Sequence, residues 1–213
     1  NGIIKRKTFR VMAEMERDYG PYPHDYFIVY GTNKIRGGME YVGATATSVV
    51  ALGHEIHHMW FAKGVMPADG NSGWMDEGIA SWRDKGYQTH ERPFYFSANL
   101  GAQNPYTRKT DKRSYEYGRS FFAYLDYQLK AAGKPGLKDF LRVWAAQKMF
   151  QNVTTDEFIK SLEAYSGMEF RDDFIQYIYG GYNKADNKGR SPAVEPENPY
   201  HPELTPEEWE ELI

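Results

Sequence analysis

The sequence predicts an α+β fold in which a small N-terminal mixed sheet is followed mostly by α-helices. Short runs of β-branched and aromatic residues occur early in the chain, whereas later segments repeat apolar residues at helical spacing. With 213 residues, of which 41% are hydrophobic and 16% aromatic, the chain can bury the core of one domain of good size or of two small ones.

The first elements are one helix and two strands. Residues 6–19 place charged and apolar residues at the spacing of a short amphipathic helix. Residues 26–30 read Y-F-I-V-Y, which predicts a strand. Gly37 and Gly38 precede residues 39–42, which predict an edge strand whose glycines let another backbone come close.

The remaining segments predict helices joined by irregular stretches. Glycines and prolines follow several of these segments and end them. Residues 91–111 are rich in Pro, Asn, Tyr and Arg and are expected to be irregular. The expected helices cover residues 47–63, 74–85, 114–132, 137–150, a segment that begins at Thr154, and 169–179.

Composition argues against several classes of function. The 26 basic and 29 acidic residues give a net charge of −3, which disfavours nucleic acid or an anionic membrane as the main partner. Cysteine is absent from the sequence, which excludes disulfides, thiolate metal sites and cysteine nucleophiles but does not identify a compartment. The sequence has no run of 18 or more apolar residues, so no transmembrane segment is predicted. The first residues, N-G-I-I-K, resemble neither an initiator methionine nor a signal peptide, so we expect a processed or excised fragment.

One short segment carries a metal-binding pattern. The residues from His54 to His58 read H-E-I-H-H and fit H-E-x-x-H within the predicted helix of residues 47–63. Positions four apart share one helical face, so His54 and His58 can direct both imidazoles at one ion. Zinc suits two imidazoles and one carboxylate with a position left for water, from which Glu55 can take a proton. His57 points about 100° away from this face, and we expect it to be solvated.

The next predicted helix offers a third ligand. Glu77 lies 19 positions after His58, and the 18 residues between them allow the second helix to fold back towards the first. A carboxylate among apolar neighbours indicates a charge that is brought inside by a cation. The sequence therefore predicts one zinc ion held by His54, His58 and Glu77. The apolar neighbours are Trp74, Met75, Ile79 and Ala80.

Five segments, in order along the chain, together resemble one family. They are residues 37–41 (G-G-M-E-Y), 54–61 (H-E-I-H-H-M-W-F), 74–80 (W-M-D-E-G-I-A), 115–118 (Y-E-Y-G) and 154–158 (T-T-D-E-F). These segments are similar to the G-x-M-E-N, H-E-x-x-H-x-W-F, W-L-N-E-G-F-A, Y-x-K-G and T-T-x-D-F patterns of the aminopeptidase N-like zinc metallopeptidases, which are gluzincins with a thermolysin-like catalytic domain. The gap of 18 residues before the ligand glutamate is also the family's.

The resemblance implies a fold and a division of the chain. It extends over about residues 26–179 and implies that residues 1–183 form a thermolysin-like zinc peptidase catalytic domain. Residues 184–213 shift to Asn, Lys, Gly, Pro and Glu and are expected to form an extended tail with a short acidic helix. Family members carry further flanking domains, so we expect a fragment that binds zinc but hydrolyses aminoacyl substrates poorly when isolated.

The resemblance also implies roles for residues outside the metal site. Glu40 would bind the free α-amino group of a peptide, and Gly37 and Gly38 would leave backbone groups open to the substrate. Tyr115 would donate a hydrogen bond to the oxyanion of the tetrahedral intermediate. Tyr117 is the alternative if the register of that segment differs.

This chain departs from the family at four positions within these patterns. Tyr41 and Asp76 stand where the family has asparagine, Tyr117 stands in place of lysine, and Gly38 stands where alanine is frequent. Two other functions therefore stay open beside the aminopeptidase: an endopeptidase on the same scaffold, and a module that binds peptides without cutting them.

Overall fold

The computed structural model describes residues 2–32, 34, 36–93, 99–101, 106 and 110–180. Within these residues the helices are α1 (Gly2–Tyr19), α2 (Leu52–His57), α3 (Met75–Asp84), α4 (Arg119–Ala131), α5 (Leu137–Lys148), α6 (Thr155–Ser166) and α7 (Arg171–Tyr177), with a π-helical turn η1 (Ser114–Gly118) directly before α4. The strands are β1 (Ile28–Gly31), β2 (Gly38–Tyr41), β3 (Ala44–Thr47), β4 (Met66–Pro67) and β5 (Asn152–Val153).

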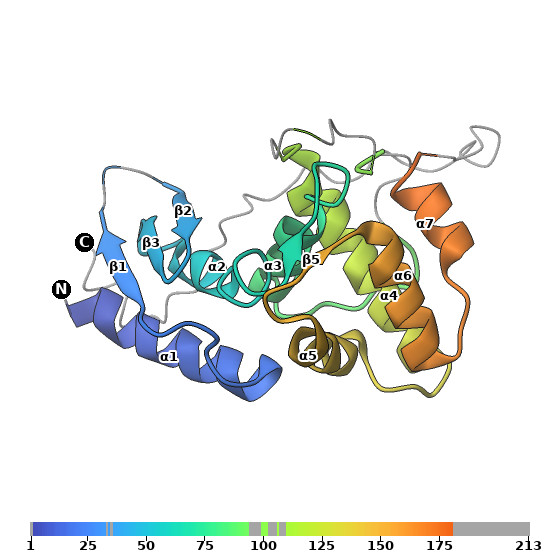
Figure 1. The fold of residues 1–213 in the computed structure, drawn as a ribbon, viewed down its shortest axis with the longest axis horizontal. Helices are drawn as coiled ribbons and strands as arrows, with labels where there is room; N and C mark the ends of the chain where they lie inside the picture. Colours follow the sequence, from blue (N-terminus) through green and yellow to red (C-terminus); the bar gives the residue numbers. More distant parts are fainter. Residues whose placement is uncertain are drawn as a thin grey trace.

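A small mixed sheet lies at one end of the molecule and helices α4 to α7 lie at the other, with α2 and α3 between them (Figure 1). Strand β3 is central, parallel to β1 and antiparallel to β2. A second, two-stranded sheet joins β4 to β5 in parallel. The predicted α+β architecture, a small N-terminal mixed sheet followed mostly by helices, is confirmed.

The two faces of the three-stranded sheet differ in exposure. Ile28 and Tyr30 of β1, together with Met39 and Tyr41 of β2, are exposed and share the face that carries the side chains of the alanines of β3. The opposite face carries the buried threonines of β3. Glu40 is paired with Thr45, so its side chain lies on this inner face, towards α2.

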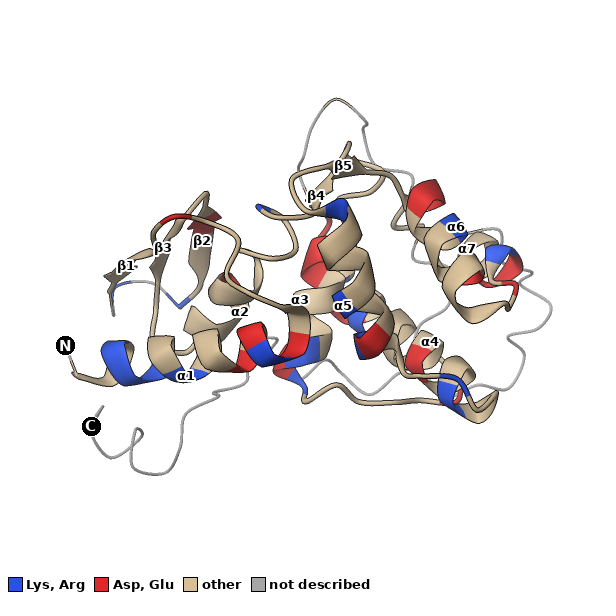
Figure 2. Ribbon diagram, turned by 60° about the horizontal axis from the view of Figure 1, so that its bottom comes forward, with Lys and Arg blue, Asp and Glu red and all other residues tan. Residues whose placement is uncertain are grey.

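The helices enclose a core that is rich in aromatic side chains. Helix α1 packs against α2 and α5 and buries Val11, Met15 and Tyr19, which recur every four residues on one face. Basic residues occupy the first half of α1 and acidic residues gather in its second half, near α3 (Figure 2). The largest buried rings include Trp60, Trp74, Trp82, Trp144, Phe121, Phe122, Phe140, Phe158, Phe170 and Phe174.

The predicted helix of residues 47–63 is wrong at both ends. Residues 44–47 form the strand β3, because Gly43, with φ of 67°, closes a two-residue turn that folds β3 back on β2. The helix ends at His57 because the following amides bond three residues back instead of four: Met59 donates to Ile56 and Trp60 donates to His57, each at 3.0 Å. Helix α2 is therefore short and presents the metal-binding pattern at its C-terminal end.

The other predicted elements are present with small changes in their bounds. Helix α1 begins at Gly2 instead of residue 6, and the predicted helix of residues 114–132 begins with the π-helical turn η1. Strands β4 and β5 were not predicted. The expected tail, residues 184–213, lies outside the described residues. None of the helices that the structure describes is long and apolar enough to cross a membrane.

Candidate metal centre

The three predicted ligands converge between α2 and α3. Nε2 of His54 lies 3.0 Å from Oε2 of Glu77, and Nε2 of His58 lies 3.4 Å from the same oxygen. One ligand atom of each residue lies within 4.8 Å of the other two. Two ligands at zinc distances of about 2.0–2.1 Å and a tetrahedral angle are about 3.3 Å apart, so this donor set fits a single zinc ion.

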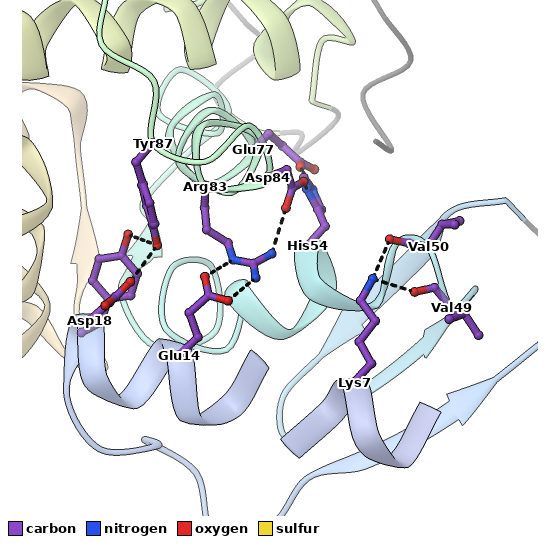
Figure 3. Close-up of polar contacts among 11 residues, drawn as sticks. Lys7, Glu14, Asp18, Val49, Val50, His54, Glu77, Arg83, Asp84 and Tyr87 are labelled. Atoms are coloured by element: carbon purple, nitrogen blue, oxygen red, sulfur yellow. Dashed lines mark hydrogen bonds and ion pairs between the residues drawn. The ribbon is translucent and has the colours of Figure 1, made fainter. Parts of the chain in front are cut away.

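Lys7 of α1 contacts the turn that leads into α2. Lys7 is fully buried, and its Nζ atom donates to the carbonyl oxygens of Val49 at 3.0 Å and Val50 at 3.4 Å (Figure 3). These carbonyls lie just before α2, so the buried ammonium group provides a hydrogen-bond donor for two backbone acceptors ahead of the helix. The contact fixes the start of α2, which contains His54 and ends directly before His58.

A carboxylate behind His54 orients its ring. Nδ1 of His54 lies 2.6 Å from Oδ2 of Asp84 in the last turn of α3 (Figure 3). Asp84 is ionised beside Arg83, so it accepts, and the Nδ1–H donates; this leaves Nε2 as the nitrogen that faces Glu77. Arg83 also donates to Glu14 of α1 through Nε at 3.0 Å and through its second terminal nitrogen at 2.8 Å, which links α1 to the site.

Sequence reasoning missed Asp84 as a member of the site. A signal was present: Asp84 follows Glu77 by seven residues, which is close to two helical turns and places both carboxylates on one face of α3. The pattern is weak by itself, because acidic residues on helices are usually solvated. Only the burial of Asp84 against His54 distinguishes it.

The buried charged groups of the site shift the pKa values of one another. Burial lowers the pKa of His54, but the carboxylates of Asp84 and Glu77 outweigh this and raise it well above its usual value. Burial likewise lowers the pKa of His58, and Glu77 raises it to about 9. Burial raises the pKa of Glu77, yet His58 and His54 together hold it well below the ordinary range. The metal-free site is therefore a carboxylate that pairs with two imidazolium groups.

Glu55 lies beside the ligands and is almost completely buried. Its exposed fraction is 3%, and within the described chain its Oε2 atom has no hydrogen-bond partner. Burial raises its pKa to about 7, while His58 and His54 act in the opposite direction. Gly38 of β2 makes room for this carboxyl group: a Cβ atom at that position would lie 2.5 Å from Cγ and Cδ of Glu55. A buried carboxyl group with a free oxygen can accept a proton near neutral pH.

Tyr115 reaches the site from η1. Its hydroxyl group donates to Oε1 of Glu77 at 2.8 Å, and its ring stacks on that of His54 with a centroid distance of 5.7 Å and an interplanar angle of 17°. Tyr117, the alternative in the other register, packs partly buried against the hydrophobic core. The geometry thus brings Tyr115 to the metal ligands.

The predicted substrate-binding residues lie on the sheet side of the site. A carboxylate oxygen of Glu40 lies within 4.8 Å of ligand atoms of Glu55 and His58. Gly38 pairs with Thr47 in the sheet, and the carbonyl oxygen of Gly37 accepts the backbone N–H of Ser48 at 3.0 Å.

The expectation that His57 is solvated is wrong. Its exposed fraction is 0%, and its ring stacks on Phe61 at 5.2 Å and meets Tyr19 of α1 edge-on at 5.6 Å. Within the described residues neither ring nitrogen has a hydrogen-bond partner, and burial holds the pKa of His57 well below its usual value. Helix α1 covers the side of α2 that helical spacing alone leaves facing solvent, so His57 is a neutral core residue.

No protein-family model and no curated protein matches this sequence. Solved structures do match. A two-domain M1 zinc metallopeptidase mutant bound to L-tryptophan matches with a TM-score of 0.65 and 19% identity, over 89% of this chain and 46% of that chain. A Deinococcus radiodurans M1 zinc metallopeptidase mutant bound to a Tyr-Ser-Ala substrate matches with a TM-score of 0.60 and 19% identity, over 76% of this chain and 41% of that chain. The fold is that of the M1 zinc metallopeptidases.

The same M1 fold occurs in a further match. Yeast LTA4 hydrolase in complex with bestatin matches with a TM-score of 0.62 and 17% identity, over 91% of this chain and 36% of that chain. The present chain thus spans less than half the length of these three proteins.

Proposed function

We propose that this chain is the catalytic part of a zinc-dependent peptidase that removes residues from the amino end of peptides. The observation that carries the proposal is the convergence of His54, His58 and Glu77 on one point, with the buried carboxyl group of Glu55 beside it. The M1 fold supports the class of reaction, because solved structures that share this fold include zinc metallopeptidases and LTA4 hydrolase.

One zinc ion is the proposed cofactor, held by the two histidines and Glu77. A zinc ion in such a site polarises a carbonyl group and lowers the pKa of a water molecule to about 7. Glu55 is the proposed general base: its oxygen without a partner accepts the proton of the attacking water and later delivers it to the leaving amine. Burial raises the pKa of Glu55, which favours uptake of that proton.

Tyr115 is the proposed donor to the oxyanion of the tetrahedral intermediate. Its hydroxyl group lies at the edge of the ligand set, 2.8 Å from Glu77. A negatively charged oxygen that forms beside the ligands competes for this hydrogen bond as charge develops on it. Such a donor stabilises the transition state more than the ground state.

The amino end of the substrate is proposed to bind at Glu40, with Gly37 and Gly38 leaving their backbone groups open to the substrate. Strand β2 is an edge strand of the three-stranded sheet, so an extended peptide can add to it. A carboxylate at that edge pairs with the α-ammonium group of the peptide.

The proposal also covers the organisation of the chain. We propose that residues 1–183 are the catalytic domain of a larger protein; the expected tail, residues 184–213, lies outside the described residues. A peptide is the expected partner, together with flanking domains of the same protein, and nucleic acid is not expected. Because those domains would complete the substrate cleft, we expect the isolated chain to bind zinc and to hydrolyse peptides slowly.

The test compares zinc content with hydrolysis in three forms of the chain. X-ray fluorescence of the purified chain is expected to show one zinc per molecule, and Glu77→Ala is expected to lose it. Glu55→Gln should retain zinc but lose about 10²- to 10⁴-fold in the rate of hydrolysis of a leucyl or alanyl chromogenic amide. Hydrolysis at the unaltered rate by Glu55→Gln, or a chain that does not bind zinc, would contradict the proposal.

A further inference from the structure

An ion pair joins Lys63 to Glu40 in the proposed substrate site. Nζ of Lys63 lies 3.3 Å from Oε1 of Glu40, and the two side chains are 23% and 20% exposed. Because both side chains are partly buried, solvent and salt screen this pair less than they screen a fully exposed pair. The chain therefore places one of its own ammonium groups on Glu40.

The pair stands directly beside the reacting groups. Glu40 is on the inner face of the sheet, and its carboxylate lies within 4.8 Å of ligand atoms of Glu55 and His58. Three carboxyl groups, those of Glu40, Glu55 and Glu77, thus lie close to His58. In the contact with Lys63, Glu40 is paired with an ammonium group at this place.

A tight loop after α2 fixes the position of Lys63. The backbone N–H of Lys63 donates to the carbonyl oxygen of His58 at 2.9 Å, and the N–H of Ala62 donates to Val65 at 3.0 Å. Ala62 has φ of 146°, in a region of backbone conformation that residues with a Cβ atom rarely adopt. The loop is thus held in a strained form that delivers Lys63 to the sheet side of the metal ligands.

Two other roles for this cluster fit the observations less well. Glu40, Glu55 and His58 form a second group that could hold a cation, but the ammonium group of Lys63 already neutralises Glu40 and repels a divalent ion. His58 also belongs to the first ligand set. A purely structural ion pair needs no place beside the proposed general base, and a pair between partly exposed groups contributes little to stability.

We propose that Lys63 is a specificity-determining residue: its ammonium group occupies the place on Glu40 that the free α-amino group of a peptide would take. The proposal rests on the proposed function, in which Glu40 receives the amino end of the substrate. A peptide with a free amino end must displace Lys63 from Glu40, whereas a peptide with a blocked amino end need not. Lys63 therefore reduces the preference of the site for free amino ends.

The test measures binding in the zinc-loaded Glu55→Gln chain, which holds peptides without cutting them. Dissociation constants of Leu-Ala-Ala and of its N-acetylated form are measured by calorimetry with Lys63 present and with Lys63→Met. Lys63→Met is expected to shift the ratio of the two constants about fivefold towards the free peptide. Lys63→Arg keeps the charge and should keep the original ratio.

Two further measurements separate direct competition from a general change in the site. In a Glu40→Gln background, Lys63→Met should have no effect on the ratio, because the competing groups then have no common partner. In the chain with ¹³C-dimethylated lysines, the signal that is missing from Lys63→Arg belongs to Lys63. This signal should move when the free peptide binds and stay in place when the acetylated peptide binds.

The outcomes distinguish the two proposals. A ratio that Lys63→Met leaves unaltered, or an equal effect of Lys63→Met with and without Glu40, would overturn the role of Lys63 while the peptidase stands. If the zinc-loaded chain binds neither peptide, and the chain with Glu55 intact cleaves neither, the proposed function is wrong and the role of Lys63 is wrong with it.

Discussion

Gly78 of α3 and Gly118 of η1 bring the backbones of these two elements into contact. A Cβ atom at Gly118 would lie 2.9 Å from the Cα atom of Gly78, and a Cβ atom at Gly78 would lie 3.1 Å from Cα and C of Gly118. Glu77 adjoins Gly78, and Tyr115 lies three residues before Gly118. The approach of the two backbones therefore lets the Tyr115 hydroxyl group reach Glu77.

Alanine at Gly78 or Gly118 is expected to destabilise the fold. Glycine to alanine inside a helix ordinarily stabilises a protein by roughly 0.5–1 kcal/mol, so the sign of the effect is diagnostic. Here the added methyl group meets backbone atoms that cannot move aside, and we expect a loss of roughly 1–3 kcal/mol. Urea unfolding of Gly78→Ala and Gly118→Ala measures the change, and a gain in stability by either variant would show that the backbones are not in contact.

The convergence of His54, His58 and Glu77 could be predicted from the sequence because the pattern that indicates it is local. His54 and His58 are related by one helical turn, and Glu77 lies in the next amphipathic segment, so spacing alone restricts where they can point. The fold class followed in the same way from short early strands and longer helical repeats. The roles of these residues in catalysis are a proposal that the experiments above test.

The features that sequence reasoning missed depend on contacts between distant segments. His57 is buried by Tyr19, 38 positions earlier, which helical spacing within α2 cannot indicate. Strand β3, A-T-A-T, has little hydrophobic content and forms because Gly43 folds it onto β2. The π-helical form of η1 leaves no obvious pattern in S-Y-E-Y-G, yet such turns are frequent at functional sites.

Zinc binding to the metal-free chain is expected to release protons. The pKa of His54 is raised well above its usual value and that of His58 to about 9. Both rings are therefore in the charged imidazolium form near pH 7. Zinc binds the neutral imidazole, and the apparent affinity should therefore rise as pH increases from about 6 towards 9. The number of protons released follows from calorimetric titrations in two buffers with different enthalpies of ionisation.

The same titrations contain their own control. Equal binding enthalpies in the two buffers at pH 7 would mean that no proton leaves, and the histidines would then be neutral before zinc arrives. Removal of zinc with a chelator should become easier at acid pH, in the same direction.

Asp84→Asn is expected to weaken zinc binding about 10- to 100-fold. The substitution keeps the size of the side chain but replaces a charged acceptor by a neutral one behind Nδ1 of His54, 2.6 Å away. The ring then becomes a poorer ligand and is held less firmly. Competition with a chelator of known affinity measures the change. Asp172→Asn, at an exposed position of α7, is the matched control and should leave the affinity as it is.

Substitution of Glu14 tests whether the contact between α1 and Arg83 also supports zinc binding. Glu14→Gln removes the charge that faces Arg83 across 2.8 Å and 3.0 Å but leaves Asp84 and His54 intact. Its effect on zinc affinity is expected to be smaller than that of Asp84→Asn. An equal or larger loss of zinc affinity would mean that the contact of α1 with Arg83 orients the site more than the contact of Asp84 with His54 does.

His57→Phe is expected to preserve or raise the stability of the chain, whereas His57→Ala should lose roughly 2–4 kcal/mol. Phenylalanine keeps the stacking on Phe61 and removes two buried ring nitrogens that have no partner within the described residues. Alanine leaves a cavity between α2 and Tyr19 of α1. Urea unfolding at neutral pH, with zinc content measured for each variant, gives both quantities. If His57→Phe were as damaging as His57→Ala, the ring nitrogens would have to make a hydrogen bond, and His57 would not be a neutral core residue.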